Sequence, residues 1–288
     1  MNVNIGKIEN SRIYFEENDG RRRQIPVPAE LPMQSDTPAR EESPACQKSV
    51  LLFVITGVEL KALLLALEKS GKKTISAEKG NLRYIKTKGF AGTVYICQSQ
   101  MGAVGPASVM NTLALALEAL QPARVIMCGI AFGFNEKKYR LGDVVVSRQV
   151  WSYEPAKLVK DRTLYRGDKT TASGYLLQCF SEAAVRYEMQ GKADCQICQG
   201  TYASGEKLVN DKDFRETLLS QEPELSAGDM EAAGLVSVCT SRRKDWIVVK
   251  GISDLGYQKE DAYQETAAGN AADFVVFTLE QILFAENG

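Results

Sequence analysis

From residue 49 onward the chain alternates short, almost continuous apolar runs with longer segments of helical periodicity. Val50–Thr56 reads VLLFVIT, Arg124–Cys128 reads RVIMC and Trp246–Lys250 reads WIVVK. Runs of this length are typical of strands buried inside a sheet that is covered on both faces. The segments between them carry apolar stripes at helical spacing, and several end at glycine or before proline. One of them is predicted as a helix over Gly105–Leu120, with Pro106 in its first turn and Pro122 after its end. We therefore predict a single three-layer α/β domain with a central mixed β-sheet flanked by helices.

Residues 1–48 have a different composition. The alternation from Val3 to Ile8 and again at Arg12–Phe15 predicts a short N-terminal β-hairpin. Residues 17–48 contain five prolines and no aromatic residue, which is typical of a linker. We predict an arm and linker over 1–48 and a catalytic domain over 49–288. Because the arm lacks a core of its own, we expect it either to pack on a neighbour or partner or to be mobile. We expect the protein to be at least a homodimer.

The charges are nearly balanced, with 35 basic and 36 acidic residues. No strong positive field is available, so neither nucleic acid nor a membrane surface is expected as a partner. The start of the chain lacks the apolar core of a signal peptide. The seven cysteines are scattered, as buried free thiols are in a reducing compartment, which indicates a cytoplasmic protein.

The chain contains no histidine. This excludes Ser-His-Asp and Cys-His nucleophile systems in their usual form, and the common zinc hydrolase sites. The Cys195-Gln196-Ile197-Cys198 segment has no second pair to complete a metal site, so we interpret these cysteines as structural. We expect no metal and no cofactor, with acid–base chemistry carried by Asp, Glu, Lys, Tyr, Cys or water.

Ligands of such folds bind beyond the carboxyl ends of strands. Four segments follow predicted strands and carry suitable groups: TGVE with Glu59, SQMGAVG starting at Ser99, GDMEAAG with Met230 and Glu231, and KGISD with Ser253 and Asp254. Each has a simpler structural interpretation, because acids and hydroxyls also cap helices and small residues also favour tight strand–helix turns. Their order and spacing are more informative than any single segment.

In that order the chain resembles the superfamily of nucleoside phosphorylases and 5′-methylthioadenosine/S-adenosylhomocysteine nucleosidases, over roughly residues 50–285. GIAFGFNEKKYRLGDVVVS is similar to the family's glycine loop and the strand that follows it. GDMEAAG is similar to the ribose-binding segment, and KGISDLG to the segment with the catalytic aspartate. The resemblance implies cleavage of the N-glycosidic bond of a purine, adenine above all, in a nucleoside or nucleotide.

The resemblance also implies a role for each site residue. Asp254 would protonate N7 of the purine with Ser253 beside it, and Glu59 would orient the attacking water. Glu231 would bind the ribose 2′ and 3′ hydroxyls with Met230 against the sugar, and Ser99 matches a serine of the family's substrate loop. An acid at N7 improves the leaving group, while a carboxylate near the sugar stabilises the developing oxocarbenium ion.

Two other functions stay open. Phosphorylases of this superfamily hold phosphate with arginines, and Met127 and Gly57–Glu59 stand at the corresponding places. A carboxylate there would repel phosphate, which favours water as the nucleophile over a phosphate-dependent reaction. The other alternative is a nucleotide-sensing module that binds without cleavage, although a binder has no need of the acid.

Three residues differ from the housekeeping nucleosidase. Phe132 brings a bulky ring into the expected pocket wall, and Leu208 replaces the aromatic residue that stacks on the base. Lys207, just before it, would suit a 5′-phosphate, but an exposed strand-end lysine is an equal alternative. The arm is similar to appendages of nucleosidase domains in bacterial signalling or antiphage proteins, which suggests an effector role by analogy.

Overall fold

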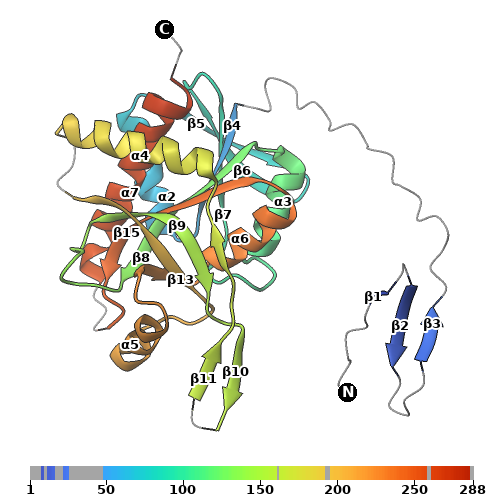
Figure 1. Ribbon diagram of the computed structural model, residues 1–288. Helices are drawn as coiled ribbons and strands as arrows, with labels where there is room; N and C mark the ends of the chain where they lie inside the picture. Colours follow the sequence, from blue (N-terminus) through green and yellow to red (C-terminus); the bar gives the residue numbers. More distant parts are fainter. Residues whose placement is uncertain are drawn as a thin grey trace. The chain divides into compact units, whose positions relative to one another are not determined.

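The computed structural model describes residues 48–160, 162–191, 195–257 and 261–285, together with three short strands nearer the amino terminus (Figure 1). Contacts divide the chain into two compact units, Met1–Glu41 and Glu42–Gly288. The division lies close to the predicted boundary between arm and catalytic domain.

The first unit contains three antiparallel strands, β1 (Ile8–Glu9), β2 (Arg12–Glu16) and β3 (Arg22–Ile25). The predicted hairpin is present as β1 and β2, while residues 3–7 lie outside the described part of the chain. The prediction of a linker from residue 17 was wrong where β3 forms. Proline and charge content described the segment as a whole, but pairing between β2 and β3 depends only on backbone groups.

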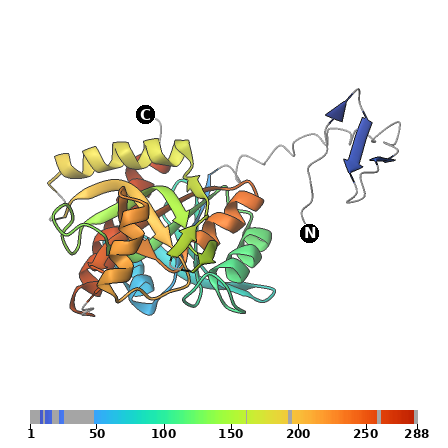
Figure 2. The ribbon, with the colours of Figure 1, turned by 60° about the horizontal axis from the view of Figure 1, so that its bottom comes forward.

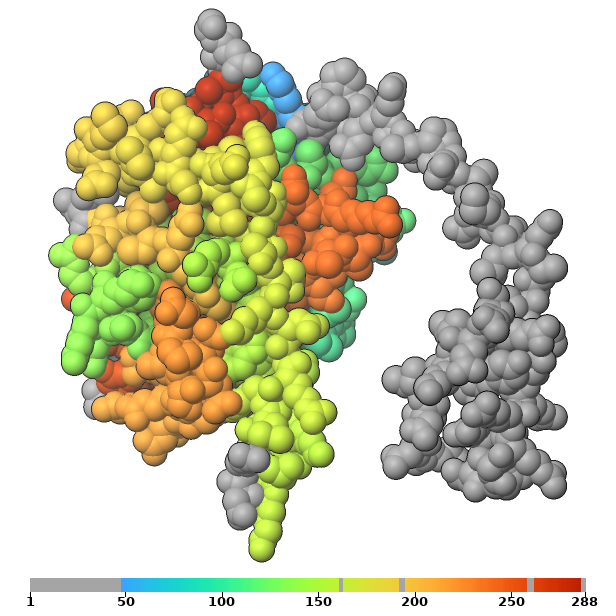
Figure 3. Space-filling model, in the orientation of Figure 1, coloured from blue at the N-terminus to red at the C-terminus, as the bar shows by residue number. Residues whose placement is uncertain are grey.

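The second unit is built on a ten-stranded mixed sheet within the described residues. Its strands are β4 (Ser49–Val54), β5 (Lys73–Lys79), β6 (Leu82–Lys88), β7 (Thr93–Gln98), β8 (Arg124–Gly133), β9 (Val144–Ser152), β12 (Lys169–Thr171), β13 (Ile197–Ser204), β14 (Leu225–Asp229) and β15 (Asp245–Asp254). A separate hairpin, β10 (Ala156–Val159) with β11 (Arg162–Tyr165), projects from the body (Figure 3).

Five of these strands pair in a closed ring. β8 pairs with β15, β15 with β9, β9 with β13, β13 with β14, and β14 again with β8. The strands β8, β14 and β15 therefore bring their last residues together at one end of a closed arrangement. This end is where the sequence placed most of its candidate residues.

Helices cover both sides of the sheet, as predicted (Figures 1 and 2). On one side α2 (Gly57–Lys69) and α4 (Gly174–Met189) pack on α7 (Gln264–Thr278), which lies against β8 and β15. On the other side α3 (Val109–Leu120) packs on α6 (Ala232–Ser241), and α5 (Lys212–Gln221) precedes β14. A short 3-10 turn, Asp261–Tyr263, leads into α7, which continues as a π-helical turn at Leu279–Leu283. Within the described residues, no helix combines the length and apolarity that crossing a bilayer requires.

Two boundaries differ from the predicted ones. The strand predicted at Arg124–Cys128 continues to Gly133, so the expected glycine loop is the end of β8. The helix predicted from Gly105 begins at Val109, because Gly102 and Gly105 have φ values of +91° and +136°, which are not helical. The β5–β6 hairpin had no apolar run to predict it, since most of its side chains face solvent.

Candidate active site

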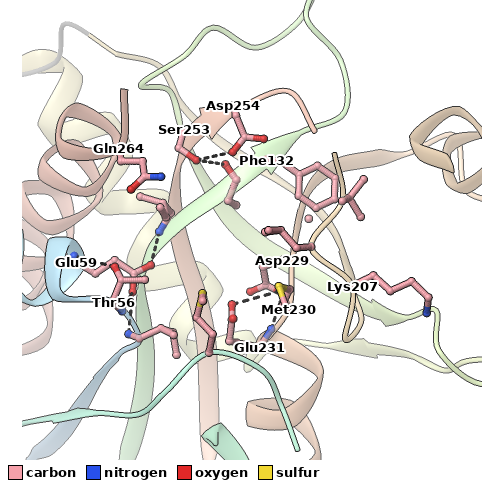
Figure 4. A pocket seen from close by; sticks show the side chains of 17 residues that line it. Thr56, Glu59, Phe132, Lys207, Asp229, Met230, Glu231, Ser253, Asp254 and Gln264 are labelled. Atoms are coloured by element: carbon pink, nitrogen blue, oxygen red, sulfur yellow. Dashed lines mark hydrogen bonds between the residues drawn. The ribbon is translucent and has the colours of Figure 1, made fainter. Parts of the chain in front are cut away.

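A cavity of about 310 Å³ lies at the ends of β8, β14 and β15, where α2 and α7 begin (Figure 4). Eight of the nine residues predicted for the site line it, on five separate segments of the chain. The lining residues are Ile55, Thr56, Glu59, Met101, Ile130, Ala131, Phe132, Lys207, Leu208, Val209, Gly228, Asp229, Met230, Glu231, Ser253, Asp254 and Gln264.

Glu59 is fixed in the wall of the cavity. It belongs to the capping box of α2, and its carboxylate accepts backbone N–H bonds from Ile55, Thr56 and Ile130, each 2.8 Å long. Gly129 makes this approach possible, because a Cβ there would lie 2.0 Å from Glu59 Oε1. Burial raises the pKa of Glu59, while the Lys250 ammonium and the three backbone donors oppose the shift. Three donors aimed at two oxygens hold the carboxylate in one orientation.

Glu231 and Asp229 share a buried cation. Lys250 Nζ lies 2.6 Å from Asp229 Oδ2 and 3.2 Å from Glu231 Oε2, and the lysine side chain is only 1% exposed. Burial alone would lower the pKa of Lys250, but Asp229, Glu231 and Glu59 raise it above its ordinary value. The lysine therefore stays charged. It holds two carboxylates beside each other that would otherwise repel.

Glu231 also receives backbone donors. Its Oε1 accepts the N–H of Gly102 at 3.2 Å, and its Oε2 accepts that of Met230 at 3.3 Å. Asp229 accepts the N–H of Ala232 at 3.1 Å at the start of α6. These contacts set the position of Glu231 from three directions. Sequence analysis did not select Lys250 or assign a role to Asp229, although a lysine closing the apolar run WIVVK was a visible signal.

Asp254 reaches the cavity through a bulge in β15. Pairing with β8 runs from Ile252 opposite Ala131 to Asp254 opposite Phe132, and Ser253 is the extra residue. Ser253 Oγ lies 3.0 Å from Asp254 Oδ2 and 3.3 Å from the carbonyl oxygen of Ala131. The N–H of Gly256 donates to Asp254 Oδ1 at 2.8 Å. Bulges commonly re-aim side chains beside active sites, as this one does.

Phe132, Leu208 and Lys207 lie on one side of the cavity. Phe132 is 5% exposed, whereas Leu208 is 64% exposed. Lys207 Nζ lies 2.6 Å from both carboxylate oxygens of Glu154, and Figure 4 shows its ammonium directed away from the acids of the site. The geometry therefore favours the alternative of a surface lysine over a contact with a 5′-phosphate.

Ser99 is the predicted residue that does not line this cavity. It lies in an adjoining groove with Gln98, Gln100 and Thr112, and its Oγ donates to the Gln100 carbonyl oxygen at 3.0 Å. The lining residues that sequence analysis missed include Met101 and Gln264. The described residues contain no group of three side chains suited to hold a metal ion, and Cys195 and Cys198 are both half-buried.

Residues 52–280 match the model of the phosphorylase superfamily. The chain belongs to this superfamily, which confirms the resemblance seen in the sequence. Its curated relatives include a 5′-methylthioadenosine/S-adenosylhomocysteine nucleosidase of Geobacillus sp. (strain WCH70), 30% identical over 186 residues, 60% of this chain and 75% of the relative. The expected enzyme class is also confirmed: the chain is an N-glycosidase.

Another relative is the ATP nucleosidase Cap17 of Escherichia coli (strain KTE188), 29% identical over 190 residues, 58% of this chain and 37% of that protein. The match therefore spans well under half of Cap17. Among solved structures, the 5′-methylthioadenosine/S-adenosylhomocysteine nucleosidase of Neisseria meningitidis in complex with methylthio-immucillin-A has a TM-score of 0.69 at 19% identity, covering 82% of this chain and 100% of that one. The futalosine hydrolase of Helicobacter pylori has a TM-score of 0.68 at 20% identity, covering 82% and 99%. These likenesses confirm the fold.

Proposed function

We propose that residues 49–288 hydrolyse the N-glycosidic bond of an adenine nucleoside or nucleotide, with Asp254 as general acid, Glu59 orienting the water and Glu231 binding the ribose diol. The observation that carries this proposal is the convergence of these three carboxylates on one cavity from the ends of different elements. The nucleosidases among the relatives support a purine substrate, and the ATP nucleosidase supports including nucleotides.

The surroundings of Asp254 suit a proton donor to N7. The hydroxyl of Ser253 can donate to Asp254 Oδ2, and the N–H of Gly256 donates to Oδ1. Each carboxyl oxygen keeps a second lone pair at which it can carry a proton. The acid is thereby oriented by donors that leave its own proton available. It delivers the proton to the base as the glycosidic bond breaks, so that the base leaves as a neutral molecule.

Water is the nucleophile in this proposal, and phosphate is not. Among the described residues that line the cavity, Lys207 is the only cation, and Glu154 already pairs with it. Lys250 lies beneath the surface and is bound to Asp229 and Glu231. A phosphate would therefore meet the fixed Glu59 carboxylate with no cation free to offset it.

The proposal is tested with a panel of adenosine, 5′-methylthioadenosine, AMP, ATP and 2′-deoxyadenosine, each with and without phosphate. We expect free adenine to appear by chromatography at a rate that phosphate does not change. We expect 2′-deoxyadenosine to be cleaved more slowly, because it leaves an acceptor oxygen of the Glu231 carboxylate unpaired. A rate that requires phosphate would identify a phosphorylase, and binding without release of a base would identify a sensing module.

The Lys207→Ala variant decides between the two interpretations of this lysine. We expect the variant to change the cleavage of ATP and adenosine by the same factor, less than about threefold, because an exposed ion pair contributes little. The measurement is the ratio of kcat/KM for the two substrates in variant and wild type. A loss confined to ATP would show instead that the lysine leaves Glu154 and binds a 5′-phosphate.

We infer that the active protein is at least a homodimer. The β10–β11 hairpin supports this, because it projects from the body and its Leu158 side chain is 80% exposed. Light scattering at micromolar concentration, on a sample with measured activity, is expected to give at least twice the mass of one chain. A monomer of full activity would contradict the prediction.

An effector role in bacterial signalling or antiphage defence follows if the substrate is an abundant nucleotide, since its cleavage would deplete the cell. The similarity to an ATP nucleosidase supports this part of the proposal. Expression of the wild-type chain is then expected to lower cellular ATP and to release adenine, while an Asp254→Asn variant leaves both unchanged. Equal pools in the two strains would argue against the role.

A further inference from the structure

We propose that Phe132 supplies the aromatic face on which the purine base packs, in place of the aromatic residue that position 208 lacks. The inference rests on the proposed function and assigns one part of its substrate to one side chain. It starts from the cavity wall: among the described residues that line the cavity, Phe132 is the only aromatic one.

The sheet places the Phe132 ring beside the acid. Phe132 on β8 is the register partner of Asp254 on β15 and of Gly228 on β14. Neighbouring strands lie about 5 Å apart, so the three residues form a short row across the end of the sheet. A base close enough to take a proton from Asp254 therefore lies near the strand position that carries the Phe132 ring.

Two glycines make room for the ring. A Cβ on Gly228 would lie 2.3 Å from the ring, which is far closer than any tolerated contact. Gly256, with φ of +75°, also lies against the ring, and a Cβ there would be 3.0 Å from Phe132 Cδ2. Phe134 packs against Phe132 with ring centroids 5.0 Å apart. The ring therefore packs against positions that have no side chain, and Phe132 is one of the residues that line the cavity.

Hydrogen bonds from α5 fix the end of β8, the strand that carries the Phe132 ring. Arg215 on α5 is buried, and its guanidinium donates to the carbonyl oxygens of Gly133 and Phe134. The Arg215 Cδ atom also lies 3.5 Å from the Cβ position of Gly256. These contacts join α5 to the last residues of β8 and to the segment that follows Asp254. The ring and the acid thus stand on one fixed support, as precise catalytic geometry requires.

Position 208 offers no comparable surface. Leu208 lies between β13 and α5, is 64% exposed and carries no ring. An aliphatic side chain on a loop contributes contact area but no π-face. We therefore assign the aromatic contact with the base to Phe132 on the sheet and not to the loop at position 208.

Binding of free adenine, measured by calorimetry, tests the inference without relying on turnover. Removal of a stacking ring typically weakens base binding about 5- to 100-fold, and we expect that loss for Phe132→Leu. Leu208→Ala is the matched control, since it also truncates a cavity residue; we expect less than about a threefold effect. The double variant Phe132→Leu/Leu208→Phe is expected to recover at least half of the lost affinity on a logarithmic scale, because it returns a ring to the cavity.

Thermal unfolding of each variant shows that it is folded, and Phe132→Met takes the place of Phe132→Leu if the latter unfolds. Unchanged adenine affinity in the ring-free variant, or a larger loss in Leu208→Ala, overturns the inference while the proposed function stands. A wild-type protein that binds no purine base overturns both.

Discussion

Asp254→Asn is expected to lower kcat by about two to four orders of magnitude while the protein stays folded. The amide keeps the shape of the side chain, and its oxygen still accepts the N–H of Gly256 that Asp254 accepts at 2.8 Å. What the variant loses is the proton that would be donated to N7. The substrate then has to leave as an unprotonated base, which is the poorer leaving group.

The measurement is single-turnover cleavage of the best substrate found in the panel, with adenine binding and thermal unfolding recorded beside it. Asp245→Asn is the matched control, because Asp245 is the exposed first residue of the same strand. Wild-type cleavage by Asp254→Asn would remove this residue from the mechanism. A loss of adenine binding equal to the loss of rate would show that it binds the base without donating a proton.

Lys250→Met is expected to lower the free energy of unfolding by about 3–5 kcal/mol and to abolish most of the activity. The variant leaves Asp229 and Glu231 buried next to each other without their cation. One of them must then take up a proton or move away, and either change disturbs the carboxylate proposed to bind the ribose. Lys250→Arg keeps the charge and is expected to retain more of both properties.

The interaction is isolated by combining Lys250→Met with Asp229→Asn. If the lysine acts mainly as the counter-ion of these acids, the double variant is more stable than Lys250→Met alone, yet it stays poorly active because Glu231 has lost its fixed donor. Chemical denaturation and substrate KM report on the two effects separately. A stable and active Lys250→Met would show that the buried ion pair has neither role.

Most of the candidate site residues could be selected from the sequence, because they stand in short local segments at the ends of strands or just after them. Glu59 lies in the first turn of the helix that follows the apolar strand β4, and Ser253 and Asp254 are the last two residues of β15. Carboxyl ends of neighbouring strands meet at one edge of a sheet, so the strand pattern already brought these groups together. Ser99 also follows a strand, yet it faces an adjoining groove, because one position along a strand end changes the direction of a side chain.

The residues that contact these side chains could not be predicted in this way, because they lie on segments far apart in the sequence. The approach of Glu59 to Ile130 depends on Gly129, which is 70 positions away in the chain. The pairing of Lys207 with Glu154 likewise joins two segments that no local pattern connects. Contacts between distant segments arise only when the sheet closes, and a periodicity in one segment carries no information about them.

The sequence by itself determined the class of fold and the acids that are candidates for catalysis, because apolar periodicity and residue type are local properties. The kind of enzyme was implied by the resemblance of its motifs to those of a known superfamily. The tertiary structure alone decided which charges these acids meet. In the folded protein Lys250 is buried between Asp229 and Glu231. Asp254 follows a bulge in β15, and the Phe132 ring packs against Gly228. The physical reason is that burial and pairing are set by what lies across the sheet, at distances of a few ångströms in space and tens of residues along the chain.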